Sequence, residues 1–134
     1  MQWLSGMRIT ADRLNDATPV ALTSTVVPAA GFTLTNFTGR KSGGVVEFSV
    51  TLTRSGADLP AASASGNIGD VTACVLPPDC RPVDLQIVQF DKSGVASGSV
   101  RISAGGGCNL TSMDPTSQIQ TGNSVNFSGA FVTG

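Results

Sequence analysis

The feature that most constrains the fold is a strict alternation of apolar and polar residues in the first half of the chain. Over residues 46–53 every second side chain is apolar, and the side chains between them are Glu, Ser or Thr. In an extended strand this period of two places all the apolar side chains on one face and all the polar ones on the other. A helix would scatter them around its axis. We therefore expect a half-buried strand of an antiparallel sheet here.

Shorter extended runs follow along the chain, separated by turn-forming residues. We expect strands over residues 20–27, 32–38, 68–76, 84–91 and 95–103, with a last strand that contains Phe127 and Phe131. The 16 glycines and 7 prolines supply turns such as Gly43-Gly44 and the hairpin signal over residues 91–94. About seven or eight short strands at this spacing predict an all-β antiparallel fold, a β-sandwich or jelly-roll-like domain.

The N-terminal segment differs from the rest of the chain. Thr10 is a suitable N-cap for a short helix over residues 11–15, and Pro19 limits its extension. A helix this short is not stable alone, so it must pack on its own body or on a partner. We divide the chain into an anchoring arm with a short helix, residues 1–19, and a β-sandwich domain, residues 20–134.

Composition excludes several classes of function. Only 13% of residues are charged and the formal net charge is -1, so no basic face is available to bind nucleic acid. No apolar run is long enough to insert into a membrane, and the first residues lack the pattern of a secretory signal. The chain has no histidine, the commonest general base and metal ligand, so we expect neither an enzyme nor a bound cofactor or metal.

Two groups of residues leave alternatives open. The cysteines are Cys74, Cys80 and Cys108, an odd number. We favour reduced, half-buried thiols, and the alternative is a Cys74–Cys80 disulfide that closes the Pro77-Pro78 loop. Among the carboxylates, the pairs Asp12 with Asp16 and Asp79 with Asp84 are closest in sequence. We interpret them as turn residues, although a glycosidase pair needs only to converge in space.

Short motifs along most of the chain suggest a family. The opening Trp3-Leu4-Ser5-Gly6-Met7-Arg8-Ile9-Thr10-Ala11-Asp12-Arg13-Leu14-Asn15 resembles the W-x-x-G-x-x-I-T-A-x-x-L-N start of many phage tail-fibre and related virion proteins. The body resembles the β-rich module that follows this start in phages of actinobacteria. The motifs in the body are Gly31-Phe32-Thr33-Leu34, Gly43-Gly44-Val45-Val46, Leu52-Thr53-Arg54-Ser55-Gly56-Ala57 and Gly66-Asn67-Ile68-Gly69-Asp70.

The resemblance implies a non-enzymatic component of the virion surface, commonly a homotrimer. Because no shaft separates the arm from the domain, we favour a capsid decoration protein that binds the major capsid protein. The alternative is a tail-fibre or receptor-binding knob that contacts tail proteins and a host surface glycan, and a carbohydrate-binding module is a third hypothesis. Docking is assigned to the arm, whose apolar and arginine side chains are typical interface anchors: Trp3, Leu4, Arg8, Ile9, Arg13 and Leu14. In the opposing interpretation these residues only plug the base of their own domain.

Overall fold

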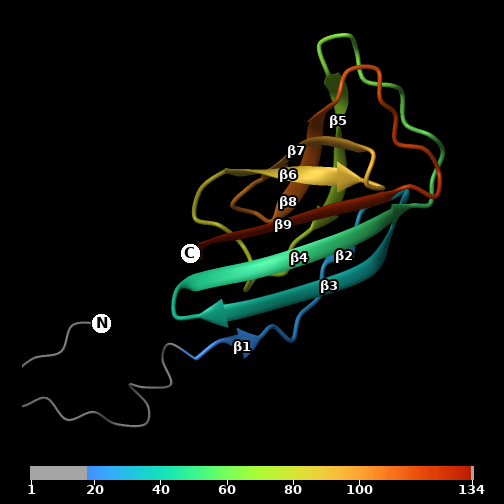
Figure 1. Cartoon of the computed structure of the whole chain (residues 1–134). Coiled ribbons are helices and arrows are strands. Elements are labelled where there is room, and N and C mark those ends of the chain that lie inside the picture. The colour runs from blue at the N-terminus through green and yellow to red at the C-terminus, as the bar shows by residue number, and fades with distance from the viewer. Residues whose placement is uncertain (1–17, 134) are drawn as a thin grey trace, which may run out of the picture.

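Every regular element of the described chain is a β-strand. The structure is a computed structural model that describes residues 18–133, and nine strands form one antiparallel sheet that curls into a half-barrel (Figure 1). The sheet order is β1-β3-β4-β9-β6-β7-β8-β5-β2. The strands are β1 (Val20–Ala21), β2 (Val27–Pro28), β3 (Phe32–Ser42), β4 (Val45–Arg54), β5 (Asn67–Val75), β6 (Gln86–Lys92), β7 (Ala96–Ile102), β8 (Gly107–Met113) and β9 (Ser124–Val132). The predicted all-β antiparallel class is confirmed.

Two details differ from the expectation. The strands belong to one continuous hydrogen-bonded sheet, whereas a sandwich has two, because β9 lies between β4 and β6 and joins the two halves. The predicted helix over residues 11–15 lies outside the described residues, as does nearly all of the arm. Residues 18–133 contain no helix, and so none that could cross a membrane.

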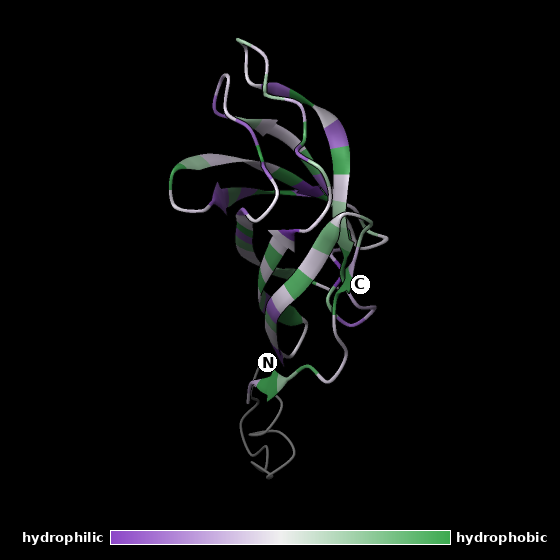
Figure 2. Cartoon of the chain, turned by 90° about the vertical axis from the view of Figure 1, so that its right-hand side faces the viewer, coloured by the Kyte–Doolittle hydropathy of each residue, from purple (hydrophilic) through white to green (hydrophobic). Residues whose placement is uncertain are grey.

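The alternating run forms β4, close to the middle of the sheet. Its apolar side chains point into the curl, where Val46, Phe48, Val50 and Leu52 are all at most 2% exposed. The polar side chains between them are more exposed, and the colours in Figure 2 show hydropathy alternating along the strands. The Phe48 ring packs between those of Phe127 and Phe131 on β9, with centroids 6.2 and 5.5 Å away. The strand prediction for residues 46–53 is therefore confirmed, including which face is buried.

A strap over residues 20–28 joins the two edges of the half-barrel. It begins as β1 on the edge of β3 and ends as β2 on the edge of β5. Between them Val26 is buried and Leu22 packs against the core. The prediction of one strand over residues 20–27 is wrong: the segment forms two strands of 2 residues each, because it pairs with opposite edges of the sheet.

Two long loops extend the core beyond the sheet. Residues 55–66 and 114–123 run side by side, with the amide of Leu59 donating to the carbonyl of Ile119 and that of Ala62 to Ser117. Ile119 and Ala62 are buried. These loops therefore belong to the packed body.

Gly98 is a position in β7 where the fold requires the absence of a side chain. A Cβ there would lie 2.5 Å from a ring carbon of Phe90 and would also overlap the carbonyl oxygen of Ser112. Gly69 in β5 is a matched contrast, because nothing lies within 4 Å of a Cβ at that position.

We predict that Gly98→Ala lowers the free energy of unfolding by about 2 kcal/mol or more, because the core must expand around the methyl group. Gly69→Ala should change it by less than about 1 kcal/mol. Urea unfolding followed by circular dichroism measures both. Equal midpoints for the two variants would contradict the packing described for Phe90.

Candidate interaction surfaces

The outer face of the sheet carries mostly hydroxyl and amide side chains. The strand register aligns them across the sheet, because Ser49 pairs with Ser128, Gln89 with Ser99, and Ser99 with Ser112. Asn67 continues the row on β5 opposite Ser112. The face follows from the alternation along each strand, and it offers hydrogen-bond donors and acceptors with little net charge.

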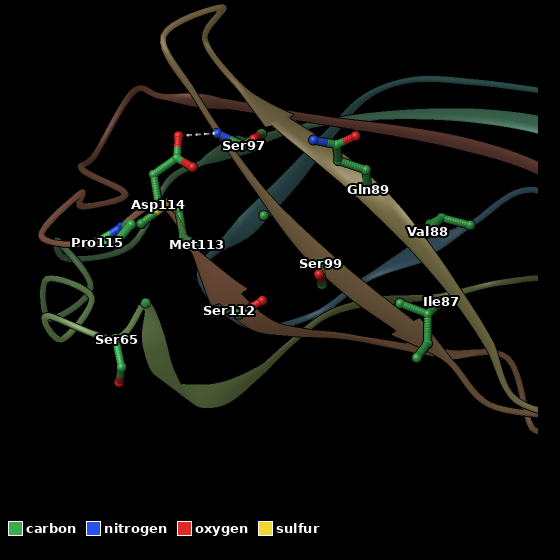
Figure 3. A pocket seen from close by; sticks show the side chains of 12 residues that line it. Ser65, Ile87, Val88, Gln89, Ser97, Ser99, Ser112, Met113, Asp114 and Pro115 are labelled. Atoms are coloured by element: carbon green, nitrogen blue, oxygen red, sulfur yellow. Dashed lines mark hydrogen bonds between the residues drawn. The ribbon is translucent and has the colours of Figure 1, made fainter.

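A shallow hollow of about 500 Å³ opens on this face. Figure 3 shows Ser99 and Ser112 on neighbouring strands at its centre, with Gln89 to one side. The side chain of Ile87 at its edge is 60% exposed. At another edge the carboxylate of Asp114 accepts a hydrogen bond of 3.1 Å from the amide of Ser97.

Two further hollows adjoin the first and share residues with it. One, of about 450 Å³, shares Gln89 and Ser97 and adds Asn126 and Ser128 from β9. The other, of about 460 Å³, shares Ile87, Ser99 and Ser112 and adds Arg101. Together they form a depression lined by hydroxyl and amide groups together with four charged side chains, Asp70, Asp91, Arg101 and Asp114. Such a lining suits a ligand with many hydroxyl groups, although no exposed aromatic ring is present in it for stacking.

A second surface, which we call the valine rim, lies at one end of the half-barrel. It comprises four exposed side chains: Val20, Val45, Val83 and Val132, exposed by 63%, 48%, 54% and 61%. Val45 and Val132 are cross-strand partners. The bridge between Pro82 and Thr133 brings Val83 to the same end, and Val20 shares a hollow with Gly43 of the β3–β4 turn. Several exposed aliphatic side chains at one end of a small domain make that end a candidate interaction site.

The arm residues assigned to docking lie outside the described residues: Trp3, Leu4, Arg8, Ile9, Arg13 and Leu14. The structure does place the point where the arm joins the body. Thr18, the first described residue, lines the same hollow of about 400 Å³ as Val20. Asp79 also lines it, and its buried Oδ1 atom has no hydrogen-bond partner. The arm therefore leaves the body at the valine rim. The rim was missed in the sequence because its four members are far apart along the chain.

All three cysteines are buried free thiols. The residue directly opposite Cys74 in the sheet is Cys108 on β8, and Cys80 lies in the turn after β5, where its amide donates to the carbonyl of Pro77. Burial, with a smaller contribution from the Asp79 carboxylate, raises the pKa of Cys80 to about 11. A hydrogen bond with the Cys74 thiol, together with burial, raises the pKa of Cys108 as well. These two thiols are protonated at neutral pH and are poor nucleophiles.

Three of the described carboxylates hold the backbone. Asp58, Asp91 and Asp114 each accept a hydrogen bond from a main-chain amide, of Thr121, Gly94 and Ser97 respectively. Within residues 18–133 no group of three or more acidic or cysteine side chains is arranged to hold a metal ion.

Comparison with known proteins adds no assignment. No protein-family model matches the sequence, and no curated protein matches it. The two surfaces and the sequence motifs are therefore the basis for a functional proposal.

The raised pKa of Cys80 predicts a loss of stability in alkaline solution. The folded state holds the thiol proton up to a pH of about 11, whereas the unfolded thiol loses it near pH 9. The contribution of the Cys80 thiol to the free energy of unfolding is therefore fully present below pH 9, and it is lost as the pH rises from 9 through 11. We expect Cys80→Ala to lose less unfolding free energy than the wild type over that range, as measured by urea titrations at each pH. Between pH 6 and 8 the unfolding free energies of the two proteins should change with pH in the same way. If they also change in the same way above pH 9, the prediction is wrong.

Proposed function

We infer that the chain is a non-enzymatic structural protein of a bacteriophage particle, a homotrimeric capsid decoration protein docked through its N-terminal arm on the major capsid protein. The phage assignment comes from the resemblance of the arm and body motifs to virion proteins. Such a protein is assembled in the host cytoplasm and is exposed on the particle surface.

The observation that carries the docking proposal is the position of the valine rim. Val20 of the rim lines the same hollow as Thr18, the first described residue, so the described chain begins at the rim. Burying apolar surface is favourable by about 25 cal/mol per Å². A partner that covers the arm would gain additional affinity by covering the rim as well.

The remaining chemistry supports binding over catalysis. The chain has no histidine, two of its three thiols have raised pKa values, and three of its aspartates hold turns and loop amides in place. The hydroxyl and amide groups of the outer face can hydrogen-bond with water, as a surface exposed on a particle requires.

We predict that Val45→Asp combined with Val132→Asp weakens binding to the particle by about tenfold or more, since two carboxylates would have to be desolvated in the interface. Val95→Asp is the matched control, because Val95 is 76% exposed but lies in the β6–β7 turn, away from the rim. Co-sedimentation of each purified variant with particles that lack the protein measures the difference. Equal loss in both variants would show that the rim plays no special part.

Two further measurements separate the remaining hypotheses. Removal of residues 1–15 should leave a folded body that no longer joins particles; an unfolded body would support the plug interpretation instead.

Gold-labelled antibody against residues 20–134 should decorate the phage head in electron micrographs. Label at the tail tip would replace the decoration role with host attachment, and particles without any label would refute the virion proposal.

A second candidate function, the receptor-binding knob, is favoured by the depression on the outer face. Exposed hydroxyl and amide side chains both donate and accept hydrogen bonds, so they can bind the hydroxyl groups of a sugar. The same surface would serve the carbohydrate-binding module hypothesis.

For this candidate we predict that Gln89→Ala, at the junction of two hollows, lowers affinity for a bound glycan by about tenfold. Thr38→Ala is the control, because Thr38 lies on the outer face in register with Ser49 but lines none of the three hollows. A glycan array followed by titration calorimetry supplies the measurement. No binding on an array of host cell-wall glycans would remove this candidate.

A further inference from the structure

Cys74 and Cys108 occupy directly opposed positions on two neighbouring strands. They are register partners on β5 and β8, both with 0% exposure. Directly opposed residues of an antiparallel pair have Cα atoms about 4.5–5.5 Å apart and side chains on the same face. Disulfides span Cα separations of about 4.4–6.8 Å. Cross-strand partners lie at a spacing that a disulfide can span, and the hydrogen bond between the two thiols places their sulfur atoms close together.

We propose that Cys74 and Cys108 are joined in a disulfide when the protein meets a disulfide oxidant such as oxidised glutathione, and that Cys80 stays a thiol. Oxidation of a cysteine pair is a covalent modification of the core that links β5 to β8. It applies to the folded domain whatever the partner of the valine rim, so it stands apart from the proposed function.

The path of the chain after β5 explains why Cys80 is the poorer partner. Pairing with β8 continues past Cys74, because the amide of Leu76 still donates to the carbonyl of Gly106. The chain turns only at Pro77, which is about 10 Å along an extended strand from Cys74. Cys80 closes that turn through its hydrogen bond to Pro77. Cys80 lies near enough to Cys108 to act on it electrostatically, but Cys74 is the residue that opposes Cys108 in the sheet and whose thiol is hydrogen-bonded with it.

The reaction consists of two thiol–disulfide exchanges. The thiolate of one cysteine attacks a sulfur of oxidised glutathione, the S–S bond of glutathione breaks, and one reduced glutathione leaves with a proton from solution. The second thiolate then attacks the mixed disulfide and releases the second reduced glutathione. In total the two cysteines lose two electrons and two protons, and one oxidised glutathione becomes two reduced molecules.

Access to the pair depends on the strap. The strand that covers Cys74 at the sheet edge is β2, of 2 residues, in which Pro28 is the partner of Cys74 and has no amide hydrogen to donate. So short an edge strand opens more readily than the central strands. Because the thiols are buried, exchange should be slow in the native protein and much faster during refolding.

The test uses two samples of the full chain. One is refolded from urea in a mixture of oxidised and reduced glutathione, and the other is incubated with the same mixture in its folded state. After blocking of free thiols, a protease that cleaves before aspartate separates the three cysteines into fragments 70–78, 79–83 and 91–113. Mass spectrometry should find fragment 70–78 linked to 91–113, and fragment 79–83 carrying the blocking group. A link from 79–83 to either other fragment, or no link after refolding, would overturn the proposal.

Variants make the test independent of the fragment analysis. Oxidised wild type and Cys80→Ala should both melt about 5 °C or more above their reduced forms, because the bond closes a long loop. Cys108→Ala should show no such rise. If the rise persists in Cys108→Ala or is lost in Cys80→Ala, the bond involves Cys80 and the proposal is wrong.

Discussion

The contact of Phe48 with β9 is the interaction on which the curl of the sheet depends. Its ring lies over Gly129, where a Cβ would come within 3.2 Å of it, and between the rings of Phe127 and Phe131. Burial of a phenylalanine side chain contributes about 2–3 kcal/mol, so this cluster stabilises the β4–β9 pair substantially. Val88 of β6 would contact the same Cβ at 3.2 Å. The cluster thereby joins β3 and β4 to the sheet formed by β6, β7, β8 and β5.

Because the sheet curls, its inner face is buried and its outer face is exposed to solvent. The inner face is filled by the apolar side chains of every long strand, and no buried polar or charged residue occurs among the described ones. The outer face then has to be compatible with water, and it is so through hydroxyl and amide groups more than through charge. This explains how a domain with few ionised side chains can present a large hydrated surface.

The two ends of the half-barrel differ in whether their apolar side chains are covered. At the end of the long loops, Ile119 and Ala62 are covered by the loops themselves. At the opposite end the four valines of the rim remain exposed, beside the start of the described chain. An end that is left apolar where a 17-residue segment attaches is physically consistent with a docking end, and the depression on the outer face is turned to a different side of the body.

The sequence by itself determined the all-β class, the β4 strand with its buried face, and most of the hairpin turns. These are local properties, since period-two alternation and glycine-rich turns act over a few residues. It did not determine that residues 20–28 divide between two sheet edges, because their apolar residues are too sparse to fix a partner. The tertiary structure alone decided which strands are neighbours, and with them the union of Val20, Val45, Val83 and Val132 in one rim. The opposition of Cys74 to Cys108 was decided in the same way. Pairing between residues tens of positions apart depends on the packing of the whole core, which no short segment encodes.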